Sequence, residues 1–118
     1  MEKVLYDTSS LILKYRKGVR RIDGLTTVLN IVEFPKALEF EKLEIVYPNP
    51  KDYELTIVLS KDLLKIGKPI PALDIIIAAV ALNRDLVLET MDTHFEAVKN
   101  IRREFKLKLL KRSCSNPR

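Results

Sequence analysis

The chain has 118 residues, of which 47% are apolar and 31% are charged, so it can form one domain with its own core and is too apolar to be disordered. It contains one cysteine and one histidine, which excludes an internal disulfide and a zinc site built from Cys and His side chains. Any metal is therefore expected to be held by oxygen atoms. The net charge of +5 makes a polyanion such as nucleic acid a candidate partner.

The chain has no obvious targeting or membrane segment. An acidic residue, Asp7, comes before any apolar run of signal-peptide length. The longest apolar run, residues 75–82, is far shorter than the roughly 20 residues needed to cross a bilayer. We therefore expect a cytoplasmic protein. Gln and Trp are absent while Lys, Glu and Ile are abundant, which favours a thermophilic source.

The first half of the chain alternates strand and helix patterns. Residues 3–6 predict a strand, and the following Asp-Thr-Ser-Ser supplies N-cap residues for a short helix. A short strand at about residues 25–26 and a helix over residues 29–40 follow, and we expect Pro35 to kink that helix or make it restart. Residues 43–47 predict a third strand, which the motif Pro-Asn-Pro closes.

The second half predicts helices at residues 52–66, 73–82 and 93–104 and strands at residues 86–88 and 106–110. Gly67 supplies the C-terminal end of the first of these helices. The second is apolar on nearly every side, so it should be the most buried. Thr93 and Glu96 form a capping-box pattern for the third. The last strand alternates charged and apolar residues, as an edge strand does.

This order predicts an α/β fold, specifically a three-layer α/β/α sandwich with a mainly parallel sheet of four to five strands. Residues 1–112 are expected to form a single domain and residues 113–118 a flexible tail. In such sheets, ligands bind outside the carboxyl ends of the strands. Function should therefore be sought at those ends.

Four acids can converge at that edge of the sheet. Asp7 ends the first strand, Asp92 follows the fourth, Asp74 lies in the first turn of the most buried helix, and Glu33 lies on the helix after the second strand. Each of the three aspartates has a structural alternative, because Asp7 can cap a helix, Asp74 can complement a helix dipole and Asp92 can lead into the capping box.

If the four acids share one pocket, electrostatic repulsion between their carboxylates makes the purely structural alternatives less favourable. Two carboxylates about 4 Å apart repel by roughly 4 kcal/mol at an effective dielectric constant of 20. Several such pairs would rival the stability of a whole domain, so convergent acids need a cation. Oxygen ligands favour Mg²⁺ or Mn²⁺, and such an ion suits the hydrolysis of a phosphodiester.

Basic residues cluster in two blocks, which is the charge pattern expected of a nucleic-acid-binding protein. The candidates for contact with a nucleic-acid backbone are Lys14, Arg16, Lys17, Arg20 and Arg21 in the first block and Arg102 and Arg103 in the second. The alternative is that both blocks are solvated helix faces and a charged edge strand.

The chain resembles the PIN-domain family over essentially its whole length. The matching segments are residues 6–12 (YDTSSLI), 30–34 (NIVEF), 73–81 (LDIIIAAVA) and 86–95 (LVLETMDTHF). The resemblance implies a Mg²⁺- or Mn²⁺-dependent ribonuclease, often the VapC toxin of a toxin-antitoxin pair, with an antitoxin as partner and a homodimer as assembly.

The resemblance also assigns roles to individual residues. Asp7, Glu33, Asp74 and Asp92 become the catalytic, metal-binding acids, with Ser9 and Thr90 as hydroxyls that orient them or a metal-bound water. His94 occupies a position where many members of the family carry another acid. As the only histidine it could contact phosphate or simply lie on the surface of a helix.

Other functions remain open on sequence alone. A phosphatase of the haloacid dehalogenase type needs a second Asp two residues after the first, where this chain has Ser9. A phosphate-receiver domain needs an acidic pair and a downstream lysine that do not fit the region around Asp7. A PIN-like domain without activity, serving as an RNA-binding or assembly module, is the non-enzymatic alternative.

Overall fold

A computed structural model describes residues 2–111 and shows five strands, five α-helices and two 3₁₀ helices within them. In chain order the elements are β1 (Val4–Tyr6), α1 (Thr8–Arg16), β2 (Arg21–Thr27), α2 (Val28–Glu33), η1 (Pro35–Glu39), β3 (Glu41–Val46), α3 (Pro50–Lys65), α4 (Ala72–Asn83), β4 (Val87–Thr90), η2 (Thr93–Phe95), α5 (Glu96–Ile101) and β5 (Lys106–Leu109). The tail predicted at residues 113–118 lies outside the described residues.

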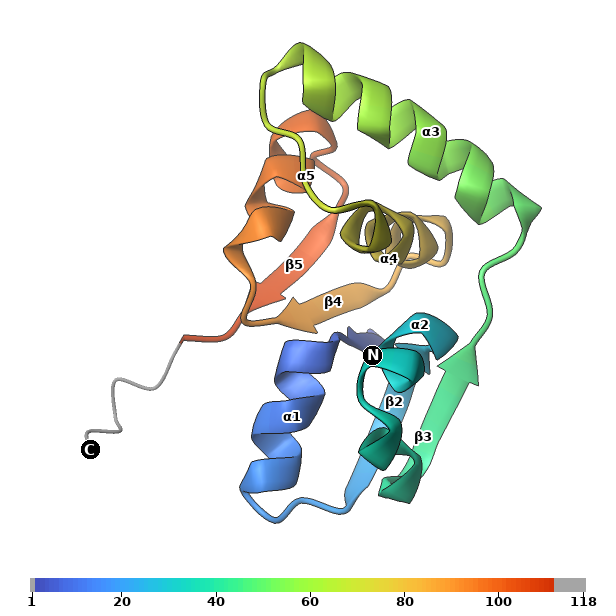
Figure 1. The fold of residues 1–118 in the computed structure, drawn as a ribbon, viewed down its shortest axis with the longest axis vertical. Coiled ribbons are helices and arrows are strands. Elements are labelled where there is room, and N and C mark those ends of the chain that lie inside the picture. Colours follow the sequence, from blue (N-terminus) through green and yellow to red (C-terminus); the bar gives the residue numbers. More distant parts are fainter. Residues whose placement is uncertain (1, 112–118) are drawn as a thin grey trace.

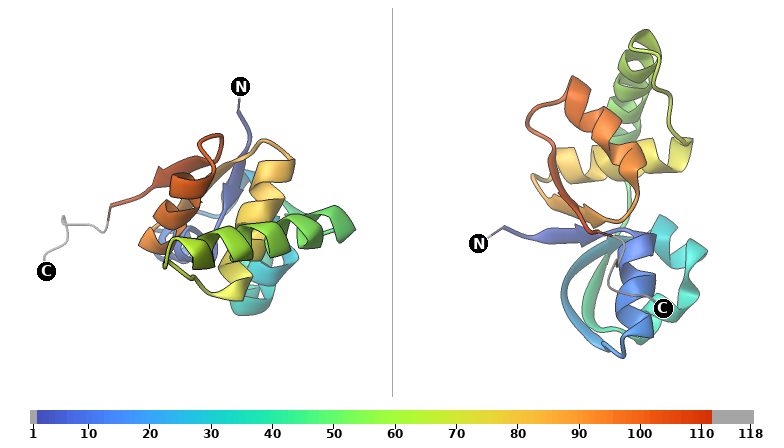
Figure 2. Two further views of the ribbon diagram at one scale, coloured as in Figure 1. Left: turned by 90° about the horizontal axis from the view of Figure 1, so that it is seen from above. Right: turned by 90° about the vertical axis from the view of Figure 1, so that its left-hand side faces the viewer.

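The five strands form one sheet in the order β3-β2-β1-β4-β5, and every neighbouring pair is parallel. Helices α1 and α2 cover one face, and α3, α4 and α5 cover the other (Figures 1 and 2). The three-layer α/β/α sandwich predicted from the sequence is therefore confirmed, with β5 at an edge of the sheet. No helix within residues 2–111 combines the length and apolar character needed to cross a membrane.

Each face of the sheet has its own core because successive strand residues point to opposite faces. Leu5 and Leu88 lie in the larger core, beneath α3, α4 and α5. Tyr6, the next residue along β1, packs into the smaller core beside Leu11 of α1 and Phe40. The hydrophobic effect thus anchors the helices of both layers to the central strands.

Helix α4 is the most buried helix, as its apolar sequence predicts: Ile75, Ile77 and the four residues from Ala78 to Ala81 are all buried. Helix α3 begins with Pro50 at its first position and is capped by Asn49 and Asp52, whose side chains each accept a hydrogen bond from the other's backbone N–H. These two helices form the outer layer together with α5.

Strand β2 begins at Arg21, several residues before the predicted start. Its first residues pair with β3 through a register shift between Arg21 and Gly24. A Cβ atom at Gly24 would lie 2.6 Å from the ring of Tyr6 and 3.1 Å from the carbonyl oxygen of Val4. Gly24 is therefore an interior strand residue that allows β1 to approach closely.

Two helix boundaries also differ from the predictions. The segment predicted as one helix over residues 29–40 is divided, because α2 ends at Glu33 and Pro35 begins the separate helix η1. This is the restart that Pro35 predicts. The capping box predicted for Thr93 and Glu96 is wrong: Asp92 is the N-cap residue, and its carboxylate accepts a hydrogen bond from the backbone N–H of His94.

Candidate functional site

The four predicted acids line one open depression of about 350 Å³ at the carboxyl ends of β1 and β4. Its wall consists of Asp7, Thr8, Ser9, Ile12, Glu33, Asp74 and Asp92. Strands β1 and β4 are neighbours although 80 residues separate them, because the chain crosses back to the first strand after β3. This reversal of strand order is the place where parallel α/β sheets bind ligands.

Asp7 is buried, with 6% of its surface exposed, and its carboxylate faces the site. It occupies the N-cap position of α1 but makes no side-chain capping hydrogen bond. Its Oδ2 instead accepts hydrogen bonds from Thr90 Oγ1 at 2.8 Å and Ser9 Oγ at 3.3 Å. Burial raises the pKa of Asp7, and these hydrogen bonds only partly oppose that shift. A helix-capping role therefore does not explain why the Asp7 carboxylate is buried at this position.

Asn30 orients Asp7 and was not identified from the sequence. It is fully buried, and its Nδ2 donates to Asp7 Oδ1 at 3.1 Å and to Thr8 Oγ1 at 2.9 Å. Its Oδ1 accepts from the N–H and the hydroxyl of Thr27, which fixes the direction of the amide. Thr8 in turn donates to Glu33 Oε1 at 2.6 Å. Asn30 thus connects two of the acids, and its spacing of three residues after Thr27 at a strand-helix junction was the available signal.

Ser9, in the first turn of α1, and Thr90, the last residue of β4, have hydroxyl oxygens 3.2 Å apart. Ser9 Oγ accepts a hydrogen bond from the N–H of Met91, and Thr90 Oγ1 accepts one from the N–H of Asp92. Each hydroxyl therefore connects the Asp7 carboxylate to the backbone that carries Asp92. This arrangement suits residues that orient the acids.

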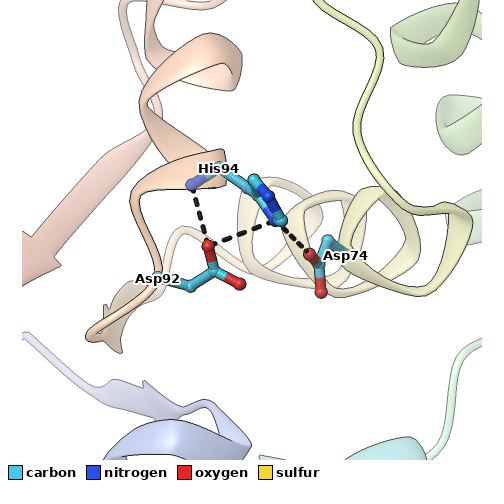
Figure 3. A group of neighbouring side chains, drawn as sticks. All are labelled: Asp74, Asp92 and His94. Atoms are coloured by element: carbon cyan, nitrogen blue, oxygen red, sulfur yellow. Dashed lines mark hydrogen bonds and ion pairs between the residues drawn. The ribbon is translucent and has the colours of Figure 1, made fainter.

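Asp74 projects from the first turn of α4 toward Asp92 and His94 (Figure 3). Burial, followed by the negative charges of Asp7 and Asp92, raises the pKa of Asp74 to about 6, although its contact with His94 opposes the shift. The electrostatic effect of both aspartates on Asp74 is a direct consequence of the convergence of three carboxylates.

His94 reaches the site, so the expectation that only oxygen atoms are available there is wrong. Its Nδ1 lies 3.2 Å from Asp92 Oδ1 and 3.4 Å from Asp74 Oδ2. One ligand atom from each of the three residues lies within 4.8 Å of the others, which is compatible with a shared metal ion. The sequence predicts that His94 lies at the start of a helix, but it does not predict the direction of the imidazole ring.

A fifth acid, Glu89, lies near the site but faces away from it. It is buried in β4 and accepts hydrogen bonds from Ser10 of α1 and from Lys14 Nζ at 2.7 Å. Burial alone would raise its pKa, but Lys14, Ser10 and the charge of Lys108 together lower it. Lys14, a predicted RNA contact, is thus already paired with a carboxylate.

The other predicted RNA contacts lie away from the acids. Arg16 ends α1, Lys17 and Arg20 follow it and Arg21 begins β2, so they lie toward the end of α1 opposite Asp7. None of them lines the depression. Arg20 stacks over the ring of Tyr15 at 3.7 Å. Arg102 lies beyond α5, where it pairs with Glu104, and Arg103 follows it. A closer cationic residue is Lys111, which lines a neighbouring depression with Ser9 and Asp92.

The fold and this edge of the sheet define a PIN-like α/β domain, the class implied by the sequence resemblance. No protein-family model and no curated protein sequence matches the chain. Solved structures match it along nearly its whole length. The similar chains include one from a DNA-bound VapBC complex of Salmonella typhimurium, with a TM-score of 0.72 and 17% identity over 92% of this chain and 98% of that one.

Two further neighbours have the same fold. A chain of the VapBC-5 toxin-antitoxin system of Mycobacterium tuberculosis has a TM-score of 0.72 and 19% identity over 95% of this chain and 100% of that one. A chain of VapBC-1 from nontypeable Haemophilus influenzae has a TM-score of 0.71 and 18% identity over 90% and 96%. The predicted VapC-like PIN fold is therefore confirmed.

Proposed function

We propose that this chain is an endoribonuclease that hydrolyses RNA phosphodiester bonds and depends on Mg²⁺ or Mn²⁺, with Asp7, Glu33, Asp74 and Asp92 as metal ligands. The observation that carries the proposal is the depression that all four acids line. Among residues 2–111, no Lys or Arg side chain forms an ion pair with any of them. Because neighbouring carboxylates repel, this arrangement favours a cation from solution.

The donor set fits a hard divalent ion, since carboxylate oxygens are the ligands such ions prefer and the open depression leaves room for water. When bound, the ion would polarise a phosphate and activate a water molecule. The chain's own contribution is to hold the acids in place. Asn30 and Thr90 fix both oxygens of Asp7, and Thr8 holds Glu33.

RNA is the substrate we propose, because the net charge of +5 includes basic residues at and after the C-terminal end of α1 and one, Lys111, near the acids. Lys111, which lines a depression with Asp92, would contact a phosphate there, and the block from Arg16 to Arg21 would contact an RNA strand that runs along α1. Such contacts attract the RNA backbone without reading its sequence.

The first test of this function is Asp7→Asn. We expect the substitution to reduce Mn²⁺-dependent RNA cleavage by more than about a hundredfold, the upper end of the cost of changing residues that only support metal ligands. Metal binding measured by calorimetry should weaken in parallel, while circular dichroism shows the fold retained.

The matched control is Asp23→Asn, which removes an exposed carboxylate of β2 outside the site. Cleavage by this variant should equal that of the unmodified protein. Equal cleavage by the Asp7 variant would refute the site. Failure of the unmodified protein to bind Mn²⁺ would favour the alternative, an inert PIN-like module that binds RNA or supports assembly.

We also propose a cellular role as the toxin of a VapBC-type toxin-antitoxin pair, because the structural neighbours are chains of VapBC complexes. Expression of the chain alone should then arrest growth, and the product of a small gene directly upstream should relieve the arrest. Normal growth with active protein present would argue against this role.

A further inference from the structure

His94 is the one polar residue of the site that the four-acid arrangement leaves without a role. Half of its side chain is exposed, yet its Nδ1 atom faces two carboxylates and not solvent (Figure 3). The position follows from the local backbone. Asp92 Oδ1 accepts a hydrogen bond from the His94 N–H at 2.9 Å, so the turn after β4 holds these two residues together.

The partner of this pair comes from a distant part of the chain. Asp74 reaches Nδ1 from the first turn of α4, where its carboxylate is only 18% exposed. Two oxygens and one nitrogen therefore converge from two independent elements, with all three atoms within 4.8 Å of one another. A single N–H on Nδ1 can satisfy one of these carboxylates well but not both, whereas one ion can bind all three atoms.

We propose that His94 is a nitrogen ligand of the metal site and that it shifts the preference of the site from Mg²⁺ toward Mn²⁺ and other first-row transition ions. This inference rests on the proposed metal-dependent function and sharpens it. Imidazole suits transition ions, whereas Mg²⁺ prefers oxygen ligands and retains its waters. A site with His94 among its ligands therefore discriminates between the two ions more strongly than carboxylates alone would.

Calorimetric titration of Mn²⁺ and of Mg²⁺ tests this preference. The variant His94→Ala should lose at least about tenfold in Mn²⁺ affinity, since even the loss of a residue that only supports a metal ligand typically costs that much, while its Mg²⁺ affinity changes much less. His94→Asp, which restores an oxygen donor, should bind Mg²⁺ at least as well as the unmodified protein.

The matched control is Glu96→Gln, which removes an exposed negative charge two residues further along without touching the donor set. Its ratio of Mn²⁺ to Mg²⁺ affinity should equal that of the unmodified protein. If the Glu96 variant changed this ratio as much as His94→Ala does, general electrostatics would explain the effect and the assignment would be wrong.

A direct readout is possible because His94 is the only histidine of the chain. Pulsed electron paramagnetic resonance of bound Mn²⁺ should detect coupling to a nitrogen nucleus, and the coupling should disappear in His94→Ala. Mn²⁺ binding without this coupling, or with an unchanged preference in His94→Ala, overturns the inference and leaves the four-acid site intact.

Two other results also overturn it and have different meanings. Binding of neither ion by the unmodified protein would refute the proposed metal dependence together with the role of His94. Weaker RNA binding by His94→Ala with unchanged affinities for both ions would assign His94 to the phosphate backbone instead.

Discussion

At the scale of single residues, the site depends on buried groups that hold the acids. Asn30 has no exposed surface and satisfies every hydrogen-bonding atom of its amide through Thr27, Thr8 and Asp7. Its role is to position Asp7 and not to contact substrate. Removing the amide takes away the partner of Asp7 Oδ1 and the acceptor for the N–H and the hydroxyl of Thr27.

We expect Asn30→Ala to lower the free energy of unfolding by about 1 to 3 kcal/mol, the cost of leaving buried polar groups unpaired. Urea denaturation measures this change. Asn30→Leu, which keeps a similar size and removes the donor to Asp7 Oδ1 without adding charge, should weaken Mn²⁺ binding as well. Unchanged Mn²⁺ affinity in Asn30→Leu would show that Asn30 does not orient Asp7.

The clustered acids also predict an unusual dependence of stability on pH. Burial together with Asp7 and Asp92 raises the pKa of Asp74 from its ordinary value of 3.8 to about 6. The folded state thus binds this proton more tightly than the unfolded state, so stability falls as pH rises between these values. For Asp74 the loss should reach about 2 to 3 kcal/mol in metal-free protein.

Urea denaturation in the presence of a chelator, from pH 4 to 7, measures this loss. The control is Asp74→Asn, which removes the titrating group, so its stability should rise relative to that of the unmodified protein as pH increases. Parallel curves for the two proteins would contradict the prediction. Added Mn²⁺ should restore most of the stability lost at pH 7, because the ion binds only the folded state.

At the scale of secondary-structure elements, an ion pair with a buried carboxylate holds α3 against α4. Asp52, fully buried in the first turn of α3, receives two hydrogen bonds from the guanidinium of Arg84 at 2.9 and 3.0 Å. Asn83 donates a third. Although burial alone would raise the pKa of Asp52, these hydrogen bonds and the charge of Arg84 hold it below its usual value.

We expect Arg84→Ala to cost about 3 kcal/mol or more of stability, because it leaves a buried charge without its partner. Arg102→Ala is the matched control, since Arg102 pairs with an exposed carboxylate of Glu104 at 3.5 Å. That change should cost less than about 1 kcal/mol. Equal losses in chemical denaturation would show that the Asp52 pair does not contribute specifically.

At the scale of the whole molecule, α3 presents an apolar surface to solvent. One side of this helix, away from the buried Leu59 and Leu63, carries Tyr53, Ile57 and Leu64. Their exposed fractions are 46%, 60% and 62%. Exposed apolar stripes of this kind favour association with another protein surface. We predict that the homodimer implied by the sequence resemblance forms through this surface.

If two copies associate through α3, Ile57→Asp should shift the protein from dimer to monomer in light scattering. The control Val58→Asp changes an exposed apolar residue about 100° around the same helix, so it should leave the dimer largely intact. A monomeric unmodified protein, or equal effects of both variants, would refute this interface.

Much of the fold could be predicted from the sequence because its signals are local. Alternating strand and helix patterns, the prolines and the helix caps act over a few residues, and they predicted the order of the elements and the parallel sheet. The positions of Asp7 and Asp92 after strands depend on the same short-range patterns. The start of β2 was missed because Arg21 and Gly24 are strand residues only through their pairing with β3.

The sequence by itself thus determined the α/β architecture and predicted that four acids lie near one edge of its sheet. Only the tertiary structure decided that β4 lies beside β1, which brings Thr90 to Asp7, turns Glu89 toward Lys14 and leads His94 into the site. The physical reason is that each of these contacts joins residues 20 or more positions apart, or depends on the rotation of one side chain. Neither leaves a periodic signal in the sequence.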